Sequence, residues 1–116
     1  MIEPLPSATA RWEVQVRKGV LEFIALLHIR MGECYGYELI TQIRKTVDLD
    51  VTEGTIYPLL KRLEREGVVS SRWVEVSGGA ARKYYAITPH GERLVAAMQQ
   101  SWLELSFGLQ RLMVAR

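Results

Sequence analysis

The sequence predicts a mainly α-helical protein with a small β-hairpin: a winged helix-turn-helix followed by a C-terminal dimerisation helix. Segments with the helical spacing of apolar residues occupy the chain up to Gly67 and again after Thr88. Between them, "VVSSRWVEV" and "RKYYAI" are rich in β-branched and aromatic residues, and "SGGAA" joins them, which predicts a two-stranded hairpin. We expect a flexible N-terminal arm over residues 1–10, the winged helix-turn-helix over 11–87 and the dimerisation helix over 88–116.

Composition limits the function classes only weakly. The 116 residues suit one domain, and a formal net charge of +2 permits nucleic-acid binding without arguing for it. The single cysteine, Cys34, excludes an internal disulfide and any two-thiolate metal site, which favours a reducing compartment. The N-terminus lacks the order of a signal peptide, and the apolar run "GVLEFIALLHI" is too short for a bilayer and is interrupted by Glu22. We therefore expect a cytoplasmic protein with no membrane partner.

Two helices are predicted before the segment of residues 52–67. Ser7 or Thr9 could cap the first, which runs to about Arg30 and is apolar around nearly its whole circumference, so it should be buried on several sides. Gly32 interrupts it, and the next helix begins near Gly36. Its apolar face consists of Leu39, Ile40, Ile43 and Val47.

The stretch "TEGTIYPLLKRLEREG", residues 52–67, has two distinct faces when it is drawn as a helix that ends before Gly67. Its apolar stripe consists of Ile56, Leu59, Leu60 and Leu63. The opposite face carries short polar groups near the start and cations further along, which suits a helix entering the major groove N-terminus first. We expect DNA contacts from Thr52, Thr55, Tyr57, Lys61, Arg62 and Arg65. The alternative is an amphipathic helix whose charged face is merely solvated.

Pro58 is unusual inside this segment. A proline in a helix interior loses one hydrogen bond and crowds the carbonyl four residues back, at a cost of roughly 3 kcal/mol. Here that carbonyl belongs to Gly54, and both residues fall on the outward face, which they keep narrow. The alternative is a helix that starts only at Pro58, which would leave Thr55 and Tyr57 in a turn.

The hairpin would supply a wing beside the reading helix. Arg82 and Lys83 follow its glycine loop and are candidates for phosphate contacts, whereas Tyr85 and Ile87 should pack on the core. The alternative is a ribbon that only packs on the core.

The last helix is expected to start at Thr88 as N-cap, with Pro89 in its first position, and to run to about Val114. Leu103 and Phe107 would pack on the first helix of the same chain. A heptad seam for a two-fold homodimer is predicted at Val95, Met98, Trp102, Leu105, Leu109 and Leu112. The alternative is that this stripe is intramolecular core. Trp102 near a two-fold axis could form a flat apolar slot for an aromatic effector.

Five segments together resemble the PadR family of bacterial transcriptional regulators, in its short class with one C-terminal helix. They are "RKGVLEFIALLHI", "YGYEL", "EGTIYPLLKRLEREGVV", "RKYYAITPHG" and the helix that follows. The resemblance implies a homodimeric winged helix-turn-helix repressor that binds a palindromic promoter element and is released by a small molecule or by other signals. It also implies DNA contacts from Tyr37, Thr55, Tyr57, Lys61, Arg82 and Lys83, and a ligand contact at Trp102. The wing has Ala80 where the family often has an arginine.

Two other function classes compete with a DNA-binding regulator. His28 and His90 have no carboxylate or cysteine partner at catalytic or zinc-binding spacing, so we expect neither an enzyme nor a bound metal or cofactor. A winged helix that contacts proteins without binding DNA is the stronger alternative.

Overall fold

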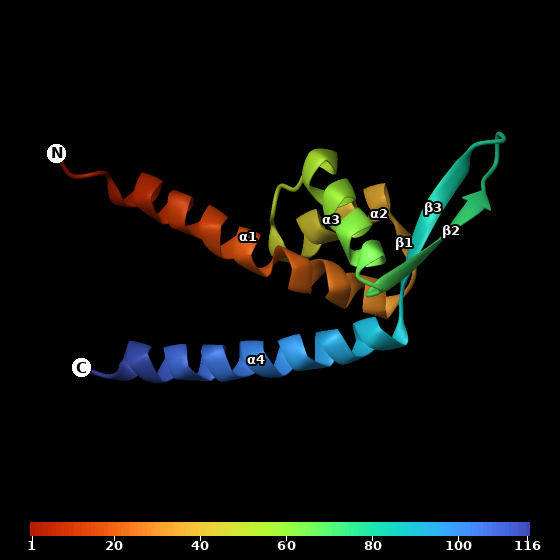
Figure 1. Ribbon diagram of the computed structural model, residues 1–116. Coiled ribbons are helices and arrows are strands. Elements are labelled where there is room, and N and C mark those ends of the chain that lie inside the picture. Colours follow the sequence, from red (N-terminus) through yellow and green to blue (C-terminus); the bar gives the residue numbers. More distant parts are fainter.

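The computed structural model describes residues 1–116 and shows the predicted mainly helical winged helix-turn-helix. Helix α2, helix α3 and the sheet lie on one side of the long helix α1, and helix α4 lies on its other side (Figure 1). In chain order the elements are α1 (Leu5–Met31), β1 (Cys34–Tyr35), α2 (Gly36–Val47), α3 (Glu53–Arg65), β2 (Val69–Glu75), β3 (Ala81–Ile87) and α4 (Pro89–Val114). None of the helices is long and apolar enough to cross a bilayer.

Helix α1 begins earlier than the sequence suggested. It starts at Leu5, and neither Ser7 nor Thr9 caps it, because both lie inside the helix. The expectation of an arm over residues 1–10 is therefore wrong from Leu5 onward. Pro6 signalled an arm, but it lies at the start of the helix, where the missing N–H would have no intrahelical partner in any case.

The core forms where α3 packs on α1 and α2. Ile56, Leu60 and Leu63 of α3 are fully buried, as predicted, and Leu59 is only partly buried. Their partners from the first two helices are mainly aliphatic: Leu21, Ala25, Leu26, Ile29, Leu39, Ile40 and Ile43. The backbone turns from α2 toward α3 through Asp48, which adopts the left-handed conformation that aspartate tolerates better than most residues.

Pro58 lies inside α3, so the alternative of a helix starting at Pro58 is wrong. The helix begins at Glu53, and the Thr52 carbonyl accepts from the Thr55 and Ile56 amides at 3.1 and 3.0 Å. Both Pro58 and Gly54 are exposed, so the Gly54 carbonyl that loses its helical partner can bond to water. A Cβ on Gly54 would meet only the Thr52 Oγ1, at 3.7 Å, so packing does not require glycine there.

The sheet has a third strand that the sequence did not reveal. Strand β1 pairs with β3 through Cys34 opposite Tyr85 and Tyr35 opposite Tyr84, which gives the order β1-β3-β2. Two residues are too few to show an alternating pattern. Cys34 is buried in this strand, and burial, reinforced by nearby Glu38 and Glu33, raises the pKa of its thiol to about 11. A thiol in this state is a poor nucleophile.

The start of α4 is fixed against the end of α3. Thr88 caps α4, as predicted, by accepting the Gly91 amide at 3.0 Å, and its hydroxyl donates to the Gly67 carbonyl at 2.6 Å. A Cβ on Gly91 would lie 2.1 Å from the Val68 carbonyl oxygen, so only glycine fits there. The "TPHG" sequence is therefore a packing motif.

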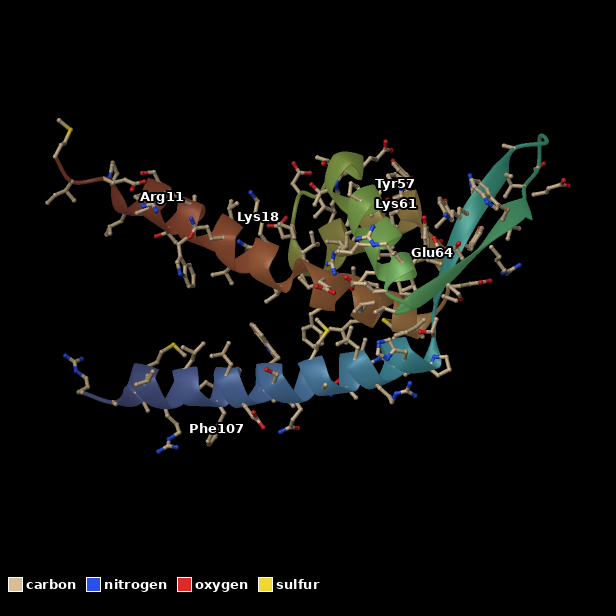
Figure 2. The ribbon with its side chains drawn as sticks, viewed as in Figure 1. Arg11, Lys18, Tyr57, Lys61, Glu64 and Phe107 are labelled. Atoms are coloured by element: carbon tan, nitrogen blue, oxygen red, sulfur yellow. The ribbon has the colours of Figure 1, made fainter.

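Helix α4 leaves α1 after its first turns, and this corrects part of the predicted seam. Val95 is fully buried in the core of its own chain, and Met98 packs partly buried against that core. These two positions fit the alternative of intramolecular core. Leu103 and Phe107 do not pack on α1 as expected: they are 54% and 63% exposed, and Phe107 points away from α1 (Figure 2).

Candidate nucleic-acid interface

The outward face of α3 carries cations that no carboxylate neutralises. Lys61 and Arg65 are exposed and form no ion pair, and Tyr57 lies one turn before Lys61 on the exposed side of the helix (Figure 2). Thr52 and Thr55 are exposed at the start of the helix, with their hydroxyls 3.4 Å apart. The arrangement presents small polar groups first and positive charge further along.

Arg62 differs from its neighbours because it is held by two carboxylates. Its guanidinium lies 3.2 Å from Glu22 of α1 and 3.1 Å from Glu66. Hydrogen bonds to Glu22 and Glu66 raise its pKa. The structure therefore places Arg62 as a link between α3 and α1, and its charge is already compensated.

Lys83 links the wing to α3 in a similar way. Its ammonium lies 3.2 Å from Glu64, whose carboxylate also accepts from the Ser71 hydroxyl of β2. The bond from Ser71 and the bond from Lys83 lower the pKa of Glu64, and the Glu64 carboxylate raises the pKa of Lys83. This set of contacts holds the base of the hairpin against α3.

Arg82 is the free cation of the wing. Its guanidinium carbon lies 4.4 Å from the centre of the Tyr35 ring, and it has no carboxylate partner. Because the side chain is exposed, this cation–π contact orients the guanidinium while leaving its N–H groups available. Ala80 and the two left-handed glycines, Gly78 and Gly79, form the loop beside it.

Tyr57 packs directly on the first residue of α2. A Cβ on Gly36 would lie 2.5 Å from the Tyr57 Cε1, so the absence of a side chain there lets the ring approach the backbone. Tyr37 is exposed in the same first turn. The structure thus brings both predicted tyrosines to the junction of α2 and α3. Sequence reasoning missed the role of Gly36, and "YGY" was the only signal for it.

A groove of about 610 Å³ runs between α1 and α3 and contains one cation that sequence reasoning missed. Lys18 of α1 lines it together with Thr55, Pro58, Lys61, Arg62 and Arg65 of α3. The almost continuous apolar character of the first helix hid the fact that one of its sides carries a lysine toward α3.

The fold and this surface are those of one class of protein, the winged-helix transcriptional regulators. The chain belongs to the transcriptional regulator PadR-like family, because residues 25–97 match the model of that family. The family resemblance predicted from the sequence is confirmed. Membership also confirms that the protein is a regulator and not an enzyme.

Similar proteins agree with this assignment. The solved structure of a PadR-like transcriptional regulator from Bacillus cereus is 39% identical, covers 88% of this chain and 99% of that chain, and has a TM-score of 0.80. A PadR family regulator from Eggerthella lenta is 28% identical over 96% of each chain, with a TM-score of 0.86. The transcriptional activator GvpE2 of Halobacterium salinarum is 32% identical over 78% of this chain and 45% of its own length.

Replacing Gly36 by alanine should displace Tyr57 without unfolding the protein. The conflicting atoms are the outer end of a tyrosine side chain that can rotate, so we expect the free energy of unfolding in urea to change by no more than about 1 kcal/mol. The NMR resonances of the Tyr57 ring should shift. Gly108→Ala is the control, since nothing lies within 4 Å of a Cβ there. Unchanged Tyr57 resonances in Gly36→Ala would contradict the close packing.

Proposed function

We propose that the protein is a homodimeric repressor that binds a palindromic promoter element through α3 and the wing, and that a small aromatic ligand releases it. The single observation that carries the DNA-binding part is the pair of uncompensated cations on the outward face of α3, Lys61 and Arg65, with a further unpaired cation, Arg82, on the wing. The apolar stripe of α3 is buried, so this face is the one that α3 presents to a groove.

Within this proposal the site residues have two roles. Lys61, Arg65 and Arg82 bind phosphates or base edges, and Arg62 and Lys83 hold α3 and the wing in place through Glu22 and Glu64. The polar groups at the beginnings of α2 and α3 approach the DNA most closely, and they are Tyr37, Thr52, Thr55 and Tyr57.

Dimerisation is supported by apolar side chains that the single chain leaves uncovered. On α4 they include Trp102, Leu105, Leu109 and Leu112, which are the remaining positions of the predicted seam. The amino-terminal half of α1 adds Leu5, Trp12 and Val16 along one side, whereas Val14 is exposed on another side. A soluble chain rarely exposes so many large apolar residues on two neighbouring helices unless a partner covers them. A two-fold dimer would present two copies of α3 to the two halves of a palindrome.

A hollow between α1 and α4 supports the ligand part of the proposal. It has a volume of about 240 Å³. Its wall is mostly apolar and consists of Gly19, Val20, Phe23, Met98, Ser101, Trp102 and Leu105. Phe23 and Trp102 offer aromatic surface to a planar molecule, and the partner's copy of the hollow would enlarge the site. Because Trp102 also belongs to the seam, ligand binding there would alter the spacing of the two reading helices.

Binding to duplex DNA from immediately upstream of the protein's own coding region should be steeply salt-dependent. If the dimer touches about six to ten phosphates, its affinity should fall by roughly 10³ to 10⁵ between 50 and 200 mM salt. Lys61→Gln should weaken binding about tenfold and reduce the slope of log affinity against log salt by roughly two per dimer. Arg62→Gln, with the same loss of charge one residue away, should have a smaller effect because Arg62 is already ion-paired.

Fluorescence anisotropy with a labelled duplex measures these affinities. No salt-dependent binding by the unmodified protein would favour the alternative of a winged helix that contacts proteins only. Equal effects of Lys61→Gln and Arg62→Gln would contradict the distinction between free and paired cations.

The substitution Leu109→Lys should convert the dimer into a folded monomer. Leu109 is exposed in the single chain, so the charge disrupts only the seam. Phe107→Lys is the matched control, because Phe107 is also exposed but lies off the seam, and it should remain dimeric. Sedimentation equilibrium gives the mass, and circular dichroism checks the fold. A dimeric Leu109→Lys protein would rule out this seam.

A planar aromatic ligand should quench the fluorescence of Trp102. Trp12→Phe with Trp73→Phe leaves Trp102 as the single tryptophan. Titration with a panel of flat aromatic compounds should quench this signal, and the same compounds should dissociate the bound duplex. If no compound in the panel quenches Trp102, the ligand site is not there.

A further inference from the structure

We propose that Lys18 of α1 binds a DNA phosphate on the flank of α3 opposite the wing. The protein would then contact the sugar–phosphate backbone on both sides of α3. The inference rests on the proposed DNA-binding function and extends it to a helix that neither the wing nor the helix-turn-helix includes. Lys18 is exposed, forms no ion pair and lies on the same side of α1 as α3 (Figure 2). Lys18 is therefore a cation without a carboxylate partner, and it lies on the side of α1 next to the outward face of α3.

The contacts of α3 define its two flanks. Arg62 reaches toward α1, where it bonds to Glu22, and Glu64 reaches toward the wing, where it bonds to Lys83. Lys61 and Arg65 are exposed on the outward face between these flanks. Lys18 lines the groove on the Arg62 side. Lys18 and the wing thus lie on opposite flanks of α3.

This arrangement fits the shape of the DNA. A helix in the major groove has one sugar–phosphate backbone on each side of it. A wing can contact only the backbone on its own side, and the opposite backbone would pass over the groove between α1 and α3. A lysine there supplies the point charge that a phosphate needs, with no requirement for base sequence.

The charge of the groove supports a phosphate in particular. Its lining includes the cations Lys18, Lys61, Arg62 and Arg65. The only carboxylate in the lining is Glu22, and Arg62 already bonds to it at 3.2 Å. The groove therefore keeps an excess of positive charge, and the part of it contributed by α1 is Lys18.

Dimerisation through α1 and α4 would leave Lys18 accessible. Val16, two residues earlier, belongs to the uncovered apolar stripe of α1, and at roughly 100° per residue it lies about 160° around the helix from Lys18. A partner that covers the Val16 side of α1 does not reach the side that faces α3.

Lys18→Gln should weaken binding to every duplex, whatever its sequence. The affinity at 100 mM salt should fall about five- to tenfold, and the slope of log affinity against log salt should decrease by roughly two per dimer. The control is Lys45→Gln, which removes the same charge from an exposed lysine in the last turn of α2. It should leave the slope unchanged. An unchanged slope in Lys18→Gln, or an equal decrease in Lys45→Gln, would overturn the inference.

Affinity cleavage locates the contact directly. Cys34 is buried and has a raised pKa, so a thiol-reactive iron–EDTA reagent should label only an added cysteine. Lys18→Cys and Arg82→Cys, each labelled in this way, should cut the duplex on opposite sides of the bases that α3 contacts. Cuts at the same side, or none from Lys18→Cys above the unlabelled background, would overturn the inference.

Two further outcomes are distinguishable. If the unmodified protein fails to bind any duplex, the proposed function and this inference both fail. If the unmodified protein binds but Lys18→Gln is monomeric in sedimentation, Lys18 belongs to the dimer interface and only this inference fails.

Discussion

The burial of the α3 stripe is the constraint on which the rest of the molecule depends. Ile56, Leu60 and Leu63 are fully buried against α1 and α2. Each such side chain contributes roughly 1.5–3 kcal/mol, so together they are comparable to the whole stability of a small domain. Turning α3 about its axis would expose these three side chains and bury Lys61, and the loss of free energy would be comparable to the whole stability of the domain. The same constraint explains why Pro58 is tolerated, since the outward face has no packing to disturb.

A second constraint sets the direction of α4 relative to α3. Thr88 bonds to the Gly67 carbonyl, and Gly91 lies so close to Val68 that no side chain fits between them. The start of α4 is therefore attached to the segment that ends α3. A rigid attachment of this kind means that a shift of α4 at the proposed dimer seam would carry α3 with it. In the proposed dimer, the separation of the two copies of α3 would thus respond to a change at Trp102 without any change within the winged helix.

Local rules predicted most of the fold, and they failed where the answer depends on distant parts of the chain. The period of apolar residues indicated α2, α3 and α4 correctly, and Thr88 was identified as a cap because capping needs only neighbouring residues. Strand β1 was missed because two residues form a strand only when β3 lies beside them. Val95 was assigned to the seam because a heptad pattern does not reveal whether its partner is the same chain or another. At the candidate site, residue type and helical phase identified the outward cations of α3, but not Gly36, whose role comes from a tyrosine in the next helix.

The charges around α3 show most clearly what the local sequence cannot predict. Arg62 and Lys83 have the residue type and position expected of DNA contacts, yet Glu22 and Glu64 hold them. An ion-paired cation must lose or share its carboxylate before it can neutralise a phosphate, so it releases less free energy on binding than a free one. Lys18 is the opposite case. Its neighbours in the sequence do not identify it as a candidate, and it lies beside α3 only because α1 packs against α3. Among the cations around α3, the proposed DNA contacts therefore differ from the structural cations in having no internal carboxylate partner. That property belongs to the folded surface, which is why a net charge of +2 says little about whether this chain binds DNA.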